Sequence, residues 1–245
     1  MGKIIAVTSG KGGVGKSTLT AHIGTALSRL GYRVLAVDFD AGLRNLDLIL
    51  GVSEDVVYDL SDVLGAKCEP FKAAYPVKHT GSYWLLPAPV SAEYSIPVGM
   101  TEKLLRGLDR FYDFILLDSP AGVGNGFQAA VKAAETAVVV VTPDPVSMRD
   151  GEKVGQILRR GDVSEIFLIV NRLKPKMLKQ ADVNDIDMII DSVKIRLLGV
   201  VPEDEQIPLH AAKGLPLPQK CAAGRAVENI AGRISGKKIN LMKIE

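Results

Sequence analysis

The sequence has few cysteines and almost no net charge. Its 245 residues include only Cys68 and Cys221, which are far apart and form no C-x-x-C pair. This usage argues against a disulfide framework and favours reduced thiols in a cytosolic protein. The 30 basic residues are balanced by 28 acidic residues. A dedicated DNA-binding protein usually has a denser basic stripe, so nucleic acid is not an expected partner.

Long apolar runs are missing too. The chain begins MGKIIAV, without the apolar region of a signal peptide, and its longest central run covers only residues 137–141. Such a run has the length of a buried strand and not of a membrane span. We therefore expect a soluble, cytoplasmic chain whose contact with a membrane is at most peripheral.

A glycine-rich stretch carries the strongest signal. Residues 9–18 read SGKGGVGKST and follow the apolar run 4–7. The spacing matches the phosphate-binding P-loop, in which backbone N–H groups and a helix N-terminus surround the phosphates. Lys16 is then expected at the β- and γ-phosphates, and the Ser17 hydroxyl at a Mg²⁺ ion. The residues predicted to contact nucleotide here are Gly10, Lys11, Gly12, Gly13, Val14, Gly15, Lys16, Ser17 and Thr18.

The same glycines allow a second interpretation. Gly10, Gly12 and Gly15 also satisfy G-x-G-x-x-G, and Asp38 follows at about the place of a ribose-binding acid in a dinucleotide site. Lys16 and Ser17 favour the P-loop, because a pyrophosphate at that helix start needs neither an ammonium group nor a magnesium-binding hydroxyl. A dinucleotide-dependent oxidoreductase would be recognised by nicotinamide binding.

Alternating apolar strands and helical patterns predict the fold. Strands are expected over 3–8, 33–38, 84–86, 114–118, 136–142, 166–170 and 196–201. Helices are expected over 19–30, 56–64, 100–111, 147–158, 182–193 and 224–234, with 41–51 a short helix or loop with a leucine underside and 70–76 a loop. The pattern specifies an α/β fold with one doubly wound, mostly parallel sheet and helices on both faces. It is expected to form a single domain over 1–235, followed by a tail over 236–245.

Two strands end in carboxylates. Residues 114–118 read FILLD, which is how a Walker B strand presents an acid, Asp118, to the magnesium shell. The strand over 33–38 delivers Asp38 and Asp40 to the same edge, where open α/β sheets bind ligands. The glycine-rich loop 119–126 follows Asp118, where a γ-phosphate would be sensed, and it can reorder on hydrolysis.

Together these segments resemble the MinD/ParA family of deviant Walker A ATPases, and its MinD members closely. The resemblance covers about residues 2–235. Its motifs are GKGGVGK at 10–16, DFDAGLRNLDLILG at 38–51, VVYDL at 56–60, DSPAG at 118–122, MRD at 148–150, NR at 171–172 and GVVPED at 199–204.

The resemblance implies roles for several residues. Lys11 is similar to the family's signature lysine, which reaches across an ATP-bound homodimer to the phosphates of the other subunit. Asp40 resembles the carboxylate that activates the hydrolytic water, and Asp38 lies near a metal shell that Ser17 and Asp118 complete. Adenine-binding elements correspond to Asn171, Arg172, Pro202, Glu203 and Asp204. The implied cofactors are ATP and Mg²⁺, with ATP closing the dimer and hydrolysis releasing it.

The implied function is placement of the cell division site, with partners of the division-inhibitor and activator type. A flagellar-number regulator, a chromosome or plasmid partition ATPase, and a non-hydrolysing nucleotide-binding scaffold stay open as alternatives. Residues 123–126 lack an acid that MinD members often carry after DSPAG. Near the segments that are expected to reorder on hydrolysis, a partner surface is expected at Arg44, Asn45, Asp47 and Asp150.

The tail reads GKKINLMKIE over 236–245. On a helix with about 100° per residue, Ile239 and Met242 lie on one side while Leu241 and Ile244 lie on another. Two inserted side chains would supply roughly 3–6 kcal/mol, or about millimolar binding, which two tails in a dimer and anionic lipid would strengthen. Two interpretations stay open: weak peripheral contact with the inner face of the membrane, and a solvated end.

Overall fold

The computed structural model describes residues 1–174 and 184–241, and their strands form one mostly parallel sheet. The strand order is β3-β4-β2-β5-β1-β6-β7-β8, and only β3 and β4 pair antiparallel. This arrangement confirms the predicted doubly wound sheet. The strands are β1 (Lys3–Thr8), β2 (Val34–Asp38), β3 (Tyr75–Pro76), β4 (Tyr83–Leu86), β5 (Phe114–Asp118), β6 (Thr136–Val141), β7 (Glu165–Leu173) and β8 (Arg196–Pro202).

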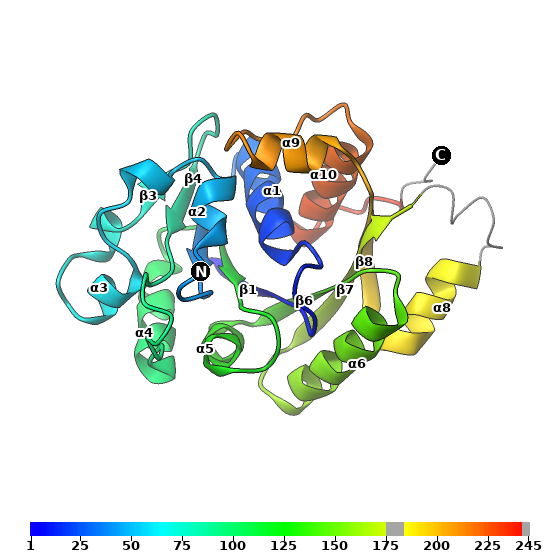
Figure 1. Cartoon of the computed structure of the whole chain (residues 1–245), viewed down its shortest axis with the longest axis horizontal. Coiled ribbons are helices and arrows are strands. Elements are labelled where there is room, and N and C mark those ends of the chain that lie inside the picture. The colour runs from blue at the N-terminus through cyan, green and yellow to red at the C-terminus, as the bar shows by residue number, and fades with distance from the viewer. Residues whose placement is uncertain (175–183, 242–245) are drawn as a thin grey trace.

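Helices cover both faces of the sheet (Figure 1). One face carries α1 (Lys16–Arg29) and α10 (Ala222–Ile234), which pack against each other. The other face carries α3 (Leu60–Leu64), α4 (Val98–Leu108), α5 (Asn125–Ala133), α6 (Pro145–Arg160) and α8 (Asn184–Val193). Two short helices, α2 (Asn45–Ile49) and α9 (Gln206–Ala211), contact each other near α1.

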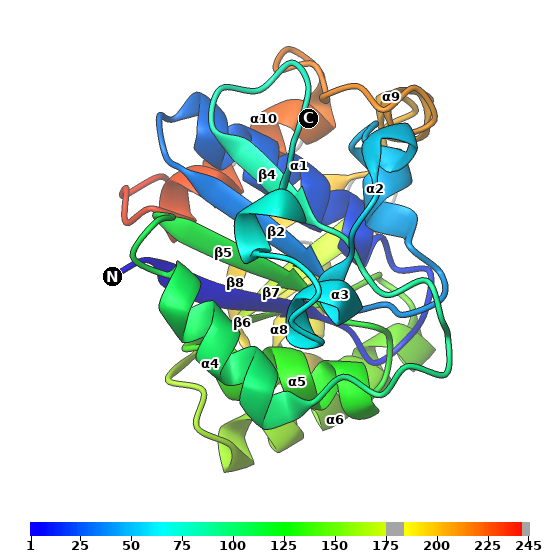
Figure 2. The same ribbon diagram turned by 90° about the vertical axis from the view of Figure 1, so that its left-hand side faces the viewer.

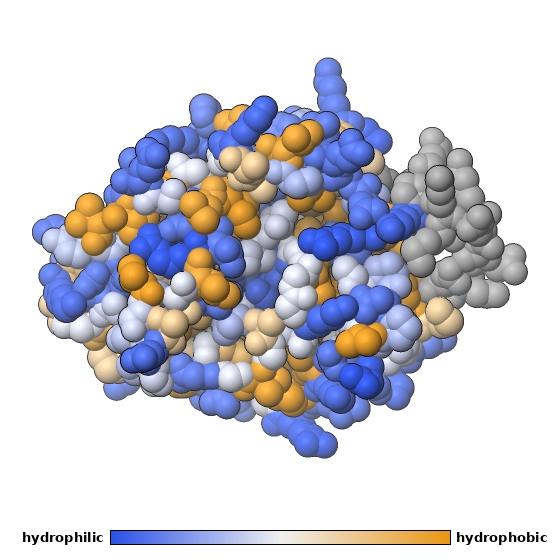
Figure 3. All heavy atoms as spheres, in the orientation of Figure 1, coloured by the Kyte–Doolittle hydropathy of each residue, from blue (hydrophilic) through white to orange (hydrophobic). Residues whose placement is uncertain are grey.

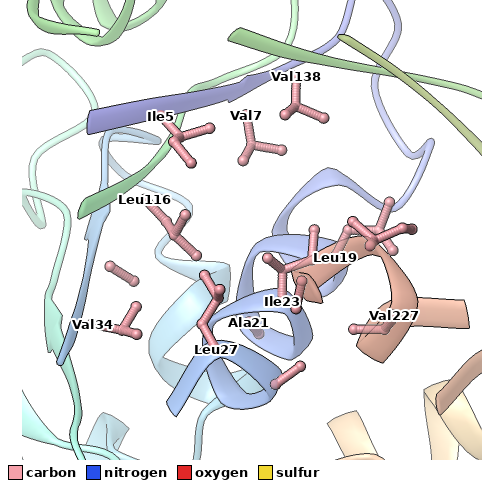
Figure 4. Packing of buried hydrophobic residues seen from close by; sticks show 14 of the residues in the cluster. Ile5, Val7, Leu19, Ala21, Ile23, Leu27, Val34, Leu116, Val138 and Val227 are labelled. Atoms are coloured by element: carbon pink, nitrogen blue, oxygen red, sulfur yellow. The ribbon is translucent and has the colours of Figure 1, made fainter. Parts of the chain in front are cut away.

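The central strands are apolar without interruption because both of their faces are buried. Along β1, Ile5 and Val7 belong to the cluster under α1 and α10, whereas Ile4 and Ala6 belong to the cluster on the opposite face. Successive strand residues point to opposite faces, so a strand covered on both sides needs apolar residues throughout. Figure 4 shows Ile5 and Val7 facing the helix that carries Leu19.

Several predicted boundaries are wrong for identifiable reasons. The helix expected over 56–64 begins only at Leu60, because Asp59 caps it by accepting hydrogen bonds from the N–H groups of Ser61 and Asp62. The segment before it donates two backbone N–H groups to the Tyr75 hydroxyl instead. Residues 70–76, expected as a loop, contain a 3-10 turn and the edge strand β3.

The structure also contains helices that the sequence patterns did not predict. The loop expected over 119–126 ends where α5 begins at Asn125, and neither α5 nor α9 was predicted. The helix expected over 182–193 is helical from Asn184, while residues 182 and 183 lie outside the described residues. None of the helices within the described ranges is both long and apolar enough to cross a membrane.

Candidate nucleotide site

The glycine-rich loop joins β1 to α1 at the carboxyl edge of the sheet, the edge that Figure 1 faces. Helix α1 begins at Lys16, three residues before the predicted start, and no side chain caps its first turn. Gly15 has a φ of 91°, and a Cβ there would overlap the Asn171 side-chain nitrogen. Only glycine fits this position. The free backbone N–H groups of α1 and the absence of acids in its first turn suit an anionic ligand.

Lys16 lies inside this site and not on the surface. Its ammonium nitrogen is 3.6 Å from Asp118 Oδ1, and the two side chains are only 8% and 1% exposed. Asp118 also accepts a hydrogen bond from the Thr20 hydroxyl at 3.2 Å. Burial raises the pKa of Asp118 above its ordinary value, and the Lys16 charge opposes that rise. The second oxygen, Oδ2, is buried and has no hydrogen-bond partner in the described part of the chain.

The two predicted metal acids are neighbours. Asp38 and Asp118 are paired in register across β2 and β5. Burial, and next the Asp118 charge, raise the pKa of Asp38 well above its usual range. Ser17 lies close enough to Asp118 to oppose the rise in its pKa, so the three predicted metal residues lie near one another. Two buried carboxylates and the unpartnered Asp118 oxygen fit a divalent cation.

The protein supplies few candidate metal ligands at this site. No group of three or more His, Cys, Asp and Glu side chains in residues 1–174 and 184–241 is arranged to hold a metal. Mg²⁺ prefers six oxygen ligands and usually keeps waters and substrate phosphates among them. The protein side of the site therefore suits a metal that arrives with a nucleotide.

Asp40 lies at the mouth of the phosphate site. It lines a cavity of about 490 Å³ together with the glycine-rich loop and Ala121. Its backbone N–H donates to Asp38 Oδ1 at 2.8 Å, which fixes its position at the end of β2. Partial burial raises the pKa of Asp40, while the Lys16 charge lowers it. A half-buried carboxylate beside the phosphate site can orient a water molecule.

Lys11 is engaged with its own chain. Its ammonium nitrogen lies 3.1 Å from Asp144 Oδ1, and the two side chains are 43% and 38% exposed. Asp144 caps α6 and accepts a hydrogen bond from the Thr142 hydroxyl. The Thr142 bond, the Ser147 N–H and Lys11 together lower the pKa of Asp144 to about 2. Asp144 was not predicted as a site residue, and its only signal was an Asp-Pro pair before a helix.

A second cavity, of about 740 Å³, opens beside the loop and suits a base and ribose. The predicted residues Asn171, Arg172, Glu203 and Asp204 all line it, whereas Pro202 ends β8 and does not. Asn171 donates a hydrogen bond to the Val14 carbonyl at 2.8 Å. Sequence reasoning missed the wall contributed by Glu205, Ile207, Pro208 and Ala211, because α9 was not predicted.

The polar groups of this cavity are not equally available. Asn171 Oδ1 is buried and has no partner within the described residues, so it can accept a hydrogen bond from a ligand. The carboxylate of Asp204 accepts the backbone N–H groups of Gln206 and Ala223. Its oxygens therefore stabilise the starts of α9 and α10.

The loop after Asp118 is held by hydrogen bonds to neighbouring backbone. In the loop after Asp118, the Gly122 N–H donates to the Ser9 carbonyl at 3.0 Å. Asn125 occupies the stretch that lacks an acid, and its amide exchanges two hydrogen bonds with the backbone of Ile96, at 2.7 and 3.1 Å. The start of α5 is thus tied to a neighbouring loop.

The expected partner surface is partly wrong. Asp47 is 4% exposed and pairs with Arg44 at 2.6 Å, so it cannot contact a partner from this position. The leucine underside is also split, since Leu46 is buried while Leu43 and Leu48 are 66% and 58% exposed. The space-filling view shows apolar and hydrophilic side chains intermingled on this face (Figure 3).

Comparison with known proteins fits this geometry. Residues 5–217 match the family model described as the CobQ/CobB/MinD/ParA nucleotide binding domain. The chain belongs to this family. It is 40% identical to the septum site-determining protein MinD of Synechocystis over 243 residues, which cover 98% of the chain and 91% of that protein.

Solved structures agree. The MinC:MinD cell division protein complex of Aquifex aeolicus matches with a TM-score of 0.90 and 41% identity, over 98% of each chain. MinD of Pyrococcus horikoshii complexed with Mg-ADP matches with a TM-score of 0.84 and 32% identity, over 96% of each chain. These likenesses confirm the predicted fold and family, and the chain is an ATPase of the MinD type.

Proposed function

We propose that this ATPase is a nucleotide-gated switch that dimerises on MgATP and helps to place the cell division site. The observation that carries the proposal is Lys11, a second cation of the loop that is exposed on the nucleotide face and whose ammonium group forms an ion pair with Asp144 there. Hydrolysis of the chain's own nucleotide needs one loop lysine, and Lys16 is already buried in the site. The exposed lysine is therefore available to a second subunit.

In the proposed mechanism each of these groups would have a separate role in ATP binding or hydrolysis. The N–H groups at the start of α1 and the Lys16 ammonium hold the β- and γ-phosphates. Ser17, Asp118 and Asp38 hold Mg²⁺, which neutralises charge on the phosphates when it is bound. Asp40 orients the attacking water. Lys11 exchanges Asp144 for the phosphates of the second subunit.

The same proposal covers partners and location. The Aquifex aeolicus relative was solved as a complex with MinC, so a division-inhibitor partner of that type is proposed here. The domain is taken as residues 1–235, with 236–245 as a peripheral contact for the inner face of the membrane. In this structure Ile239 packs against Gly232, so this side chain has to leave the body before it inserts into lipid.

The test is the mass of the full-length chain by light scattering with MgATP and with MgADP. A dimer is expected with MgATP only. Lys11→Ala should bind ATP yet stay monomeric, and Lys103→Ala, which removes an exposed lysine on α4, should dimerise normally. An ATP-dependent dimer of Lys11→Ala would refute the role of Lys11. Partition of DNA would be indicated instead if the wild-type dimer binds duplex DNA and fails to bind a MinC-type partner.

A further inference from the structure

A separate cavity of about 490 Å³ lies at the opposite edge of the sheet from the nucleotide site. Its walls come from the first residues of β1, β6, β7 and β8 and from the chain after α10. Figure 2 shows the red C-terminal segment on the same side as the N-terminus, away from α2. Nothing in the nucleotide mechanism uses this cavity.

The floor of the cavity is apolar. Ile5, Val138 and Leu198 contribute to it, and each is at most 5% exposed. Phe167 and Ile234 also line the cavity and pack against the same core cluster. A ligand lying on this floor would be in contact with hydrocarbon, which favours an apolar chain.

The rim has the opposite character. The lining residues include five cations, Lys3, Arg196, Arg233, Lys237 and Lys238, and one acid, Glu165. The whole chain, by comparison, has 30 basic and 28 acidic residues, so this concentration is local. The single acid is already compensated, because the Lys3 ammonium lies 2.8 Å from Glu165 Oε2.

Three of the rim cations are available to a ligand. Arg196, Lys237 and Lys238 form no ion pair within residues 1–174 and 184–241. The Arg196 guanidinium lies 5.8 Å from the centre of the Phe167 ring, at the boundary between rim and floor. An anion bound there would be directly above an apolar surface.

Residues 236–240 form one wall and are held in place. Arg233 donates to the carbonyl oxygens of Leu198, Ile239 and Asn240 at 2.8, 2.9 and 2.6 Å. Gly232 leaves room for Ile239, because a Cβ at that position would overlap Ile239 Cδ1. The segment that supplies Lys237 and Lys238 is therefore fixed against the body, which keeps both lysines at the rim.

We propose that this cavity binds an anionic amphiphile, with a single acyl chain on the apolar floor and its carboxylate or phosphate at Arg196, Lys237 and Lys238. A small polar anion would leave the floor in contact with water, and a neutral hydrocarbon would leave the cations unpaired. A ligand with both features satisfies both surfaces. The inference does not depend on division-site placement.

The test is a titration of the full-length protein with cis-parinaric acid, an anionic acyl chain whose fluorescence rises in apolar surroundings. We expect one site per chain. Arg196→Gln should weaken binding about tenfold, as expected for loss of a hydrogen-bonded charge. Lys103→Gln removes one positive charge on the other face of the sheet and should change nothing. Unchanged ATP binding shows that each variant is folded.

Two further experiments are needed. One tests whether the anionic group of the probe contributes to binding in addition to its acyl chain, and the other identifies the source of the ligand. The methyl ester of the same probe should bind at least tenfold more weakly, because it has no anion for the rim. Displacement of the probe by phosphatidylglycerol vesicles would identify membrane lipid as the source, and no displacement would identify the free acid. Absence of saturable binding, equal binding by Arg196→Gln, or equal binding of the ester would overturn the proposal.

Discussion

His22 makes the stability of this ATPase depend on pH in a way that can be measured. The side chain lies in α1 and is 4% exposed, and its Nε2 atom has no hydrogen-bond partner in the described part of the chain. Burial, and next the charges of His210 and Arg29, lower the pKa of His22 from 6.5 to about 4. The folded protein therefore holds this imidazole neutral.

The sign follows from proton binding. Between pH 6.5 and about 4 the unfolded chain binds a proton at His22 that the folded chain does not. The contribution of His22 to stability is therefore complete above pH 6.5 and is lost as the pH falls toward 4. At pH 4.5 the loss amounts to roughly 2.5 kcal/mol, since each pKa unit corresponds to about 1.4 kcal/mol.

The assay is urea unfolding of the nucleotide-free protein at several pH values from 7.5 to 4.5, followed by circular dichroism. His22→Met and His22→Gln do not titrate in this range, so both variants should lose about 2.5 kcal/mol less than the wild type over the same interval. The comparison uses the change in the free energy of unfolding between pH 7.5 and 4.5, so a difference in stability between the proteins at pH 7.5 does not affect it. Parallel pH profiles for the wild type and both variants would refute the reasoning.

Three predictions concern the nucleotide site. Lys16→Ala should lower ATP affinity at least tenfold in calorimetry, whereas Asp40→Ala should bind ATP normally and release phosphate at least a hundredfold more slowly; normal turnover by both would contradict the assignments. Gly15→Ala should also fail to bind ATP, because its φ of 91° and the Asn171 nitrogen exclude a Cβ; normal affinity in calorimetry would show that the loop adapts. Asp144→Asn releases Lys11 in both subunits from exposed ion pairs worth about 0.2–1 kcal/mol each, or about 0.4–2 kcal/mol per dimer, so light scattering should show the MgATP dimer forming at up to about thirtyfold lower concentration; weaker dimerisation would show that Asp144 assists instead.

Much of the fold and the chemical core of the site could be predicted from local patterns. The run before Gly10 and the run ending in Asp118 are continuous apolar segments, and a parallel strand buried on both faces requires such segments. Lys16 and Ser17 follow the glycine-rich loop directly, so a short motif contains both the predicted phosphate cradle and a predicted metal ligand. In these places residues adjacent in sequence are also adjacent in space.

The tertiary structure alone decided the contacts between distant segments. It brought Asp144 to Lys11, and Asn171 to Gly15 and Val14, across more than a hundred residues of chain. Burial of a polar side chain depends in the same way on what packs over it. No local pattern therefore marks a contact whose partner is chosen by the order of strands in the sheet.

The C-terminal tail shows the same limit most clearly. Its sequence was compatible with a membrane contact and with a solvated end, because the residues of a short segment do not show which other parts of the chain it packs against. In the structure Arg233 fixes residues 239 and 240 over a cavity built from the starts of four strands, while residues 242–245 lie outside the described part of the chain. The sequence by itself determined the family, the sheet and the glycine-rich and acidic motifs, whereas the fold decided which side chains from remote segments meet around them.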